Sequence, residues 1–357
     1  MVSLHNLSPA SGHQTRFGKA IGFVAGGIGD QIYHLTQLRA LAAASNDGVI
    51  DIACISPSPI ATLLAHTDWV NTVIDARPLR RYLPGLRGES AVRSLRQNRY
   101  DTAFFLHRST SFKIAAMRAG IRHRVGLSGQ KMDRFLLHHS LSLTAGGARR
   151  SLWGHRPFIA AIDEYVEAQG LILDDTTPTI TPDVAATAEV KTMLEGMQGP
   201  ITIVNLYALD SARRWPIADA IHVISRLATE TGGTFLLNAG PDASAYHRDA
   251  MAAWHNATAH NPALHAGQLR DCLTLNPSMA KDVALYQAAD YYLGVDSFTA
   301  NLALNSNLQS VILFAKPSDI LQYRPFCEPI AAPIEGQIGS INPADILHGF
   351  AQLRSRA

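Results

Sequence analysis

Short apolar runs alternate with stretches in which apolar side chains recur every three or four residues. The runs, rich in Val, Ile, Phe and Ala, lie at 21–25, 48–56, 69–76, 99–107, 123–129, 201–208, 234–240, 291–295 and 310–315. Each run predicts a strand, and the periodic stretches between the runs predict helices. The strands lack a clean alternation of polar and apolar residues, so we expect both faces of each sheet to be buried. The pattern therefore predicts an α/β fold with doubly wound parallel sheets.

The alternation changes character between residues 151 and 198, where the segment LILDDTTPTITPDVAAT is rich in Thr, Asp and Pro. A chain of 357 residues also exceeds the usual size of a single core. We predict an N-terminal Rossmann-like domain at 1–170, a linker region at 171–198, a C-terminal Rossmann-like domain at 199–342 and a C-terminal helix at 343–357. Ligands bind such sheets beyond the carboxyl ends of the strands, so we expect the active site in a cleft between the domains.

A glycine turn follows the first strand and contains Gly26, Gly27 and Gly29. The residues after it have the apolar spacing of one helix face, which predicts a single helix carrying Ile32, Leu35 and Leu38. Glycines let backbone N–H groups approach a ligand closely, and a helix start favours negative charge. Asp30 lies at this start, where a carboxylate is either a helix cap or a catalytic group.

The turn does not match the dinucleotide-binding fingerprint G-x-G-x-x-G, because its third glycine would fall on Ile32. Asp51 nevertheless lies about 20 residues beyond the glycines, where a ribose-binding acid is expected in a Rossmann dehydrogenase. A dehydrogenase therefore stays as a distant alternative.

Two later turns at strand ends also carry candidate chemistry. The segment DSFTAN, residues 296–301, offers the Ser297 and Thr299 hydroxyls and backbone N–H groups at the head of a helix, which suits a diphosphate. The alternative is an ordinary N-cap by Asp296 or Ser297. Arg213 and Arg214 follow an earlier strand and either neutralise the same phosphates or face solvent.

The charges divide unevenly along the chain, although the net charge is only +2. Residues 1–170 hold 20 Lys and Arg against 11 Asp and Glu, a net of +9, and the remainder has a net of −7. The arginines concentrate in one segment with Glu89 as its single acid: Arg77, Arg80, Arg81, Arg87, Arg93, Arg96 and Arg99. The segment is either a solvated face or a surface for an anionic partner such as lipid headgroups. Nucleic acid is disfavoured, because no aromatic-plus-basic strand motif or zinc spacing accompanies the arginines.

The remaining composition favours a cytoplasmic protein. Three distant cysteines, Cys54, Cys272 and Cys327, suit a reducing compartment. No apolar run reaches the roughly 18 residues of a membrane span, and the first 20 residues lack the apolar core of a signal peptide. No metal-binding cluster is visible, since His138 and His139 are adjacent rather than one helical turn apart.

In combination and order, these motifs resemble glycosyltransferase family 9, the ADP-heptose:lipopolysaccharide heptosyltransferases, which have the two-domain GT-B fold. The resemblance runs from about Ile21 to Phe326 and rests on GGIGD, RYDTAFFLHRS with AGIRHRVGLSG, RRWP, TFLLNAGPDA and QAADYYLGVDSFTANLALNSNLQSVILFA. It implies an inverting, metal-independent enzyme with Asp30 as general base and with Arg213 on the donor phosphate. Asp296 and Ser297 match the start of the family's donor turn.

The chain departs from the family pattern at five positions. Phe298 replaces a glycine, Thr299 a leucine and Asn301 a histidine, Lys316 stands at a Gly-Pro pair, and Thr36 replaces a proline. These departures leave open a relative that uses another nucleotide sugar or a protein acceptor, or a weakly active nucleotide-sugar binding protein.

The resemblance also places the two substrates. The resemblance implies an ADP-linked nucleotide sugar as donor, expected at Gly27, Gly29, Asn205, Arg213, Arg214, Gly240, Asp296, Ser297, Phe298 and Thr299. An anionic lipid-linked or phosphorylated saccharide acceptor is expected at Arg77, Arg80, Arg81, His107, Arg108 and Lys113. The net charge of +9 on residues 1–170 suits such an anionic acceptor. The cytoplasmic face of the inner membrane is a further candidate partner. No metal or other cofactor is expected.

Overall fold

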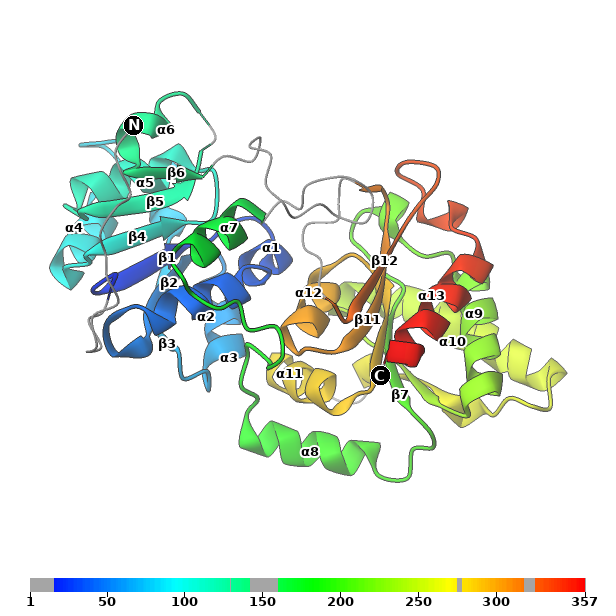
Figure 1. Ribbon diagram of the computed structural model, residues 1–357. Coiled ribbons are helices and arrows are strands. Elements are labelled where there is room, and N and C mark those ends of the chain that lie inside the picture. The colour runs from blue at the N-terminus through cyan, green and yellow to red at the C-terminus, as the bar shows by residue number, and fades with distance from the viewer. Residues whose placement is uncertain (1–15, 129, 142–159, 275–277, 318–324, 357) are drawn as a thin grey trace.

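The computed structural model describes residues 16–128, 130–141, 160–274, 278–317 and 325–356. They form two α/β domains side by side, each built on a parallel six-stranded sheet (Figure 1). The predicted fold class is therefore confirmed.

The sheet of the N-terminal domain has the strand order β3-β2-β1-β4-β5-β6. Its strands are β1 (Ala20–Phe23), β2 (Ile50–Cys54), β3 (Val70–Asp75), β4 (Thr102–Phe105), β5 (His123–Leu127) and β6 (His139–Leu141). The sheet is flanked by α1 (Ile28–Ile32), α2 (Leu35–Ala43), α3 (Pro57–Leu64), α4 (Glu89–Asn98), α5 (Thr110–Arg118), α6 (Asp133–Leu136) and α7 (Ala160–Ala168).

The sheet of the C-terminal domain has the order β12-β11-β10-β7-β8-β9, which is the same plan once its strands are numbered from β7. Its strands are β7 (Ile201–Asn205), β8 (Thr234–Leu237), β9 (Leu269–Asp271), β10 (Tyr291–Val295), β11 (Gln309–Phe314) and β12 (Cys327–Ala331). The helices of this half are α8 (Val184–Leu194), α9 (Ile217–Thr231), α10 (Ser244–His260), α11 (Met279–Ala288), α12 (Phe298–Asn305) and α13 (Pro343–Arg356). Both sheets therefore have the 3-2-1-4-5-6 order of a Rossmann fold.

The central strands are buried on both faces, as their composition predicts. All four residues of β1 are buried, and alternate side chains enter different apolar clusters. Phe23 stacks on Phe105 of β4 with ring centroids 5.0 Å apart on one face, while Phe104 packs edge-on against Phe17 on the other. Successive side chains of a strand point to opposite faces of the sheet, and here both faces are covered, so these runs are largely apolar throughout.

One expected helix is two helices. The stretch after the glycine turn breaks at Tyr33 and His34, and His34 has the non-helical φ and ψ of −93° and 4°. The two parts have different neighbours: α1 packs on α12 of the other domain, whereas α2 packs on β2 and α7. The break lets the short first helix turn toward the C-terminal domain, so the prediction of one continuous helix was wrong.

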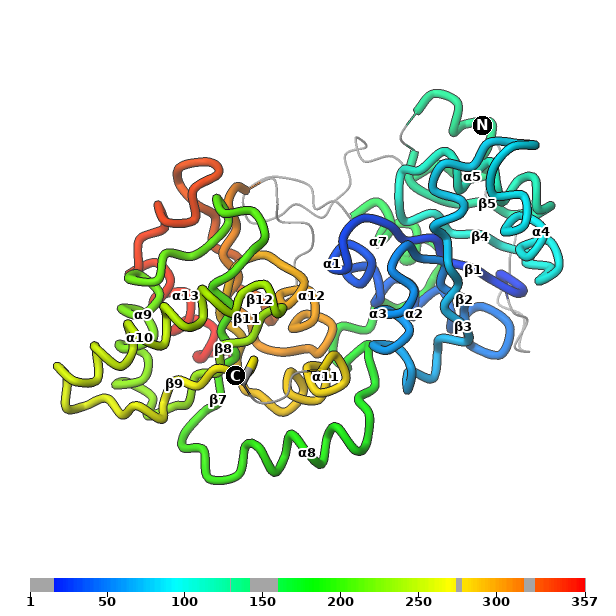
Figure 2. Tube along the Cα trace, turned by 180° about the vertical axis from the view of Figure 1, so that it is seen from behind, coloured from blue at the N-terminus to red at the C-terminus, as the bar shows by residue number. Residues whose placement is uncertain are grey.

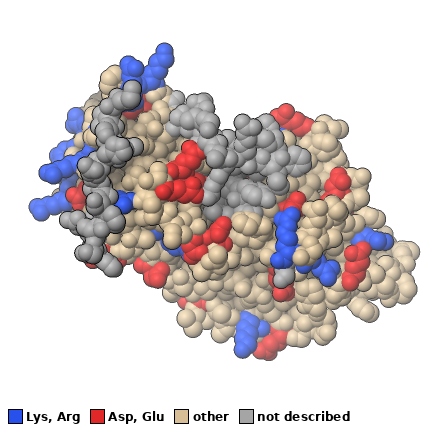
Figure 3. Space-filling model, viewed as in Figure 1, with Lys and Arg blue, Asp and Glu red and all other residues tan. Residues whose placement is uncertain are grey.

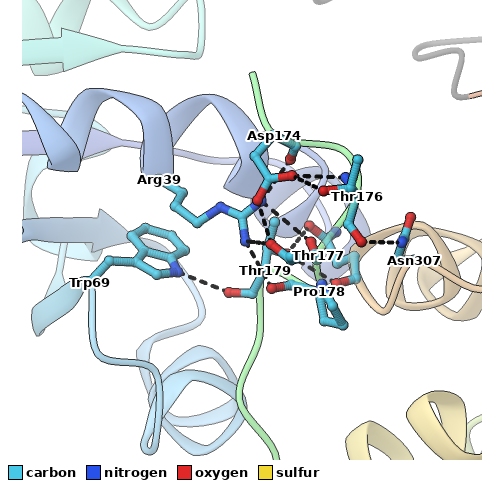
Figure 4. Close-up of polar contacts among 9 residues, drawn as sticks. Arg39, Trp69, Asp174, Thr176, Thr177, Pro178, Thr179 and Asn307 are labelled. Carbon is cyan, nitrogen blue, oxygen red and sulfur yellow. Dashed lines mark hydrogen bonds and ion pairs between the residues drawn. The ribbon is translucent and has the colours of Figure 1, made fainter. Parts of the chain in front are cut away.

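The linker between the domains bonds to the N-terminal domain first (Figure 4). The Arg39 guanidinium donates to the carbonyl oxygens of Asp174 (2.6 Å) and Pro178 (2.8 Å), and it forms a 3.2 Å ion pair with the Asp174 carboxylate. The Trp69 indole N–H donates to the carbonyl oxygen of Thr179 at 2.9 Å.

The same segment bonds to the C-terminal domain. The Thr179 N–H donates to the carbonyl oxygen of Asn305 at 2.8 Å, and the Asn307 side chain donates to the carbonyl oxygen of Thr176 at 2.8 Å. Gln287 of α11 donates to the carbonyl oxygen of Ile180 at 2.6 Å. The linker is thus held by both domains. Figure 2 shows α8, which lies within the predicted linker region 171–198, beneath α11.

Across the described ranges, no helix combines the length and apolarity that crossing a membrane requires.

Candidate active site

Each sheet has one point at which its strand order reverses, between β1 and β4 in the N-terminal domain and between β7 and β10 in the C-terminal domain. Ligands of doubly wound sheets bind at these points, beyond the carboxyl ends of the strands. Asp30 and His107 follow β1 and β4, whereas Asn205 ends β7 and Asp296 follows β10. The candidate residues on four separate segments therefore gather at two switch points.

The glycine turn brings Asp30 back over its own backbone. Gly26 has a φ of +107°, and a Cβ at that position would lie 2.3 Å from Oδ2 of Asp30, so this residue must be glycine. The same Oδ2 accepts a hydrogen bond from the Gly27 N–H at 2.7 Å. Asp30 therefore does cap the start of α1, as one interpretation expected, and it does so from an exposed position. Its cap contact and a catalytic role are compatible.

Helix α1 lies directly against α12 across the domain interface. A Cβ on Gly29 would lie 3.3 Å from Cα of Phe298 and 3.2 Å from Nδ2 of Asn301. Asn305 Nδ2, near the end of α12, donates to the carbonyl oxygen of Ile32 at 3.0 Å. Asp30 therefore stands on a helix that touches the helix of the candidate donor turn.

The donor turn is organised by Asn205. Its Nδ2 donates to Oγ of Ser297 at 2.8 Å and to Oγ1 of Thr299 at 2.7 Å. The two hydroxyls lie 2.7 Å apart, and the buried Tyr292 hydroxyl lies 3.0 Å from Oγ1 of Thr299. Ser297 is the N-cap residue of α12, yet its side chain makes no capping bond to the helix. The Ser297 side chain therefore does not cap the helix in the ordinary way, because its hydroxyl bonds to Asn205 and Thr299 instead.

Arg213 reaches the same turn from the loop after β7. Its Nη2 donates to Oδ2 of Asp296 at 2.9 Å and also to the carbonyl oxygen of Asp296. Arg214 turns away: its guanidinium lies 4.4 Å from the centroid of the Tyr207 ring and donates to the carbonyl oxygen of Ala208 at 2.9 Å. The structure thus joins Arg213, but not Arg214, to the donor turn.

The Phe298 side chain is half-buried and packs against the apolar cluster that continues across the domain interface. Its ring therefore contributes to the core. Gly240 precedes the short turn Pro241–Ala243 after β8, and a Cβ there would meet open space. Lys316 lies 4.0 Å from Glu335, and Thr36 is buried within α2.

His107, which follows β4, lies within electrostatic range of Asp30 and of three cations, Lys113, Arg80 and Arg108. Burial lowers the pKa of the His107 imidazole, Arg80 and Arg108 act in the same direction, and the Asp30 carboxylate raises it. The Asp30 charge also raises the pKa of the buried Tyr33 hydroxyl, in addition to the larger effect of burial. The Asp30 carboxylate thus acts on both the His107 imidazole and the Tyr33 hydroxyl.

The other predicted acceptor residues differ in accessibility. Arg77 is exposed and pairs with Asp75 at 2.7 Å, and Arg81 is exposed. Lys113 is completely buried: its Nζ donates to Oδ2 of Asp133 at 2.7 Å and contacts the carbonyl oxygen of Arg108 at 3.4 Å. Lys113 therefore supports the His107–Arg108 turn from within. Its predicted direct contact with an acceptor was wrong for this conformation.

Asp51 does not occupy a ribose site. It lies near the beginning of β2, is buried, and accepts hydrogen bonds from Asn71 at 2.7 Å and from the Tyr100 hydroxyl. A ribose-binding acid belongs at the opposite, carboxyl end of that strand. This placement removes the residue on which the dehydrogenase alternative depended.

Sequence reasoning missed three residues that shape the site, Gln31, Tyr292 and Asn305. All three are buried, and Gln31 and Asn305 bond to segments distant in the sequence, whereas the Tyr292 hydroxyl contacts Thr299 in the turn that follows its strand. A polar residue inside an apolar helix face was the one available signal. In the part of the chain that the structure describes, no three His, Cys, Asp or Glu side chains come together in a way that could hold a metal ion.

We compared the chain and its fold with known proteins. No protein-family model and no curated protein matches the chain. Solved structures do. The ADP-heptose lipopolysaccharide heptosyltransferase II of E. coli aligns over 95% of this chain and 100% of its own, with 21% identity and a TM-score of 0.68.

Two further structures agree. A glycosyltransferase of family 9 from Veillonella parvula aligns over 95% of this chain and 98% of its own, with 12% identity and a TM-score of 0.73. The E. coli heptosyltransferase WaaC, solved with ADP-2-deoxy-2-fluoro heptose, covers 95% and 100%, with 14% identity and a TM-score of 0.63. Over nearly its whole length, the chain therefore has the two-domain GT-B fold that these glycosyltransferases share.

Proposed function

We propose that this protein is an inverting, metal-independent glycosyltransferase that moves a sugar from a nucleotide sugar to an anionic glycan acceptor. The observation that carries the proposal is the contact of α1 with α12, which packs the helix that bears Asp30 against the helix that begins in the candidate donor turn of the other domain. Solved proteins of the same fold are heptosyltransferases, and two are described by their ADP-linked donors, so ADP-heptose is the first candidate donor.

The proposed reaction uses Asp30 of the N-terminal domain and the candidate donor turn of the C-terminal domain. Asp30 accepts the proton of an acceptor hydroxyl while that oxygen forms a bond to the anomeric carbon. The bond from that carbon to the diphosphate oxygen breaks, and its electron pair leaves with the nucleoside diphosphate. Attack and departure on opposite faces invert the anomeric centre. The charge that develops on the diphosphate is stabilised by the N–H groups at the start of α12, the Ser297 hydroxyl and Arg213.

Thermal unfolding with a panel of nucleotides tests the donor side. A ligand that binds only the folded state raises its stability with the logarithm of ligand concentration over Kd, by about 2.7 kcal/mol at a hundredfold excess over Kd. We expect ADP and ADP-heptose to raise the Tm, and UDP, GDP and NAD to leave it unchanged. A shift with another nucleotide alone would change the proposed donor. No shift with any would contradict nucleotide-sugar binding.

Two alternatives keep the fold and change the function. Phe298 and Asn301, which depart from the family pattern, support a relative that uses another sugar or a protein acceptor. The second alternative is a protein that binds a nucleotide sugar without transferring it. This alternative would be favoured if the unaltered protein transfers no sugar and if Asp30→Asn leaves donor binding unchanged.

The acceptor side supports an anionic, lipid-linked substrate presented at the cytoplasmic face of a membrane. Figure 3 shows Lys and Arg gathered over the outer part of the N-terminal domain. Large apolar side chains are exposed in the loop before α4, on α5 and at α6, namely Leu83, Leu86, Met117, Met132 and Phe135, and both α4 and α6 pack on α5. Exposed apolar side chains among arginines fit the boundary between anionic headgroups and acyl chains.

Vesicle sedimentation tests this surface. We expect binding to vesicles of phosphatidylcholine with phosphatidylglycerol, but not to phosphatidylcholine alone, and weaker binding as salt increases. Replacing Leu86 and Phe135, which are 80% and 70% exposed, by Ser should remove most of the binding. The matched control replaces Val184 and Ile334, which are 84% and 55% exposed on the other half of the chain. Equal losses in both pairs, or no binding by the unaltered protein, would contradict a membrane-facing surface.

A further inference from the structure

Gln31 is a polar side chain in the core of the N-terminal domain, and it follows Asp30 directly. It is completely buried. Its Oε1 accepts hydrogen bonds from the backbone N–H groups of Ile55 and Ser56, both at 3.0 Å. Its Nε2 donates to the carbonyl oxygens of Gly26 and Gly27, at 3.2 and 3.0 Å, and to Oγ of Ser56 at 3.1 Å.

These bonds join two turns that the sequence separates. One is the glycine turn after β1, and the other is the turn after β2 that opens α3. Glycines have the widest choice of backbone conformations, so a turn built from them needs external contacts to hold one geometry. The Gln31 amide supplies such contacts to two successive carbonyls on the side opposite the Asp30 bond to the Gly27 N–H.

The second turn adds a connection to the domain interface. Ser56 is the N-cap residue of α3, and α3 packs on α11 of the C-terminal domain. The amide of Gln31 therefore ties the backbone that carries Asp30 to a helix resting on the other domain. Buried hydrogen-bonded networks of this kind fix one conformation when all members are satisfied.

We infer that Gln31 is a positioning residue, which holds the glycine turn so that the Asp30 carboxylate faces the donor turn. This inference rests on the proposed function for its effect on catalysis, but not for its effect on the turn. Gln31 touches no substrate in this role and acts through the backbone of Gly26 and Gly27.

The test compares Gln31→Met with Gln37→Met. Both glutamines are completely buried, and both substitutions keep the length of the side chain while removing its hydrogen bonds. Gln37 bonds instead to Asp163 of α7, at 2.6 Å from Nε2 to Oδ1, and among the described residues its side chain makes no hydrogen bond to the glycine turn. Both variants therefore lose a buried amide, but only Gln31→Met removes hydrogen bonds to the backbone of the two turns.

Amide hydrogen exchange measured on peptides provides the readout that is independent of activity. Exchange in the peptide spanning residues 24–32 should rise about five- to a hundredfold in Gln31→Met, the factor that corresponds to the cost of about 1–3 kcal/mol for losing the bonds of one buried amide. Gln37→Met should leave that peptide at the wild-type rate. Unchanged exchange in Gln31→Met would overturn the inference. If Gln31→Met does not fold, Ser56→Ala, which removes one bond, should raise exchange in the same peptide by a smaller factor, and no rise would overturn the inference equally.

Kinetics with the proposed substrates provide the second readout. We expect Gln31→Met to lower kcat while the donor KM stays unchanged, and Gln37→Met to change neither. A kcat equal to that of Gln37→Met, despite faster exchange at the turn, would make Gln31 purely structural and overturn its positioning role. If the unaltered protein transfers no sugar, the proposed function fails, and hydrogen exchange still decides whether Gln31 holds the turn.

Discussion

Asp30→Asn is expected to slow sugar transfer by about a hundred- to ten-thousand-fold, the usual contribution of a general base. Donor affinity should stay nearly unchanged. Asparagine keeps an oxygen that accepts the hydrogen bond from the Gly27 N–H, so the turn should keep its shape. An amide cannot accept the acceptor's proton, however, so the chemical step is lost. Initial rates at saturating acceptor, with calorimetry of donor binding, measure the two effects separately.

Asp30→Ala is the companion variant, because it removes both the cap and the base. It should also abolish transfer with little change in donor affinity, and its stability should fall by about 1 kcal/mol from the lost cap. A large loss of donor binding in both variants would instead assign Asp30 to the cap alone. Transfer by Asp30→Asn at the wild-type rate would remove it as the base.

Arg213→Ala is expected to weaken donor binding by about ten- to a hundredfold and to slow turnover as well, because charge-assisted hydrogen bonds contribute about 1.5–3 kcal/mol. Arg213 also holds the Asp296 turn through Nη2, so its loss affects both the charge and the shape of the donor site. Steady-state kinetics over a range of donor concentrations measure both effects.

Arg214→Ala is the matched control, since it removes a neighbouring arginine that stacks on Tyr207. It should leave donor KM within about twofold of wild type, as expected for a partly exposed contact of this kind. Equal losses in the two variants would show that the positive charge of the loop as a whole matters. Unchanged kinetics in Arg213→Ala would place that side chain outside the donor site.

The sequence was sufficient to predict the interior of both sheets, because central strands need apolar residues on both faces. It did not reveal the strands β6, β9 and β12, which are edge strands of their sheets. The first two have three residues each, and β12 contains Pro329, which an edge strand tolerates because one side of its backbone needs no partner. Short or proline-containing edge strands are stabilised by pairing, and single-sequence patterns do not show pairing.

In the candidate site, too, some features could be predicted from local sequence and others could not. The glycine turn and the Asp296–Thr299 turn could be predicted, because a tight turn and a helix start depend on local sequence. The role of Gln31 could not, since its partners include residues 55 and 56. Burial of Lys113 depends likewise on Asp133, which is 20 residues away. A pattern of charged residues cannot show which of them the fold encloses with a counter-charge.

The Asn305 side chain connects the linker between the domains to α1, the helix that carries Asp30. Its Oδ1 accepts from the Thr179 hydroxyl of the linker at 2.6 Å, while its Nδ2 donates to the Ile32 carbonyl of α1 at 3.0 Å. Rotation of one domain about the linker therefore strains the same amide that holds α1 to α12. If the proposed function holds, we expect domain opening for product release to separate Asp30 from the donor in the same movement, so that a change in linker length or stiffness alters the distance between base and donor as well as the range of domain motion.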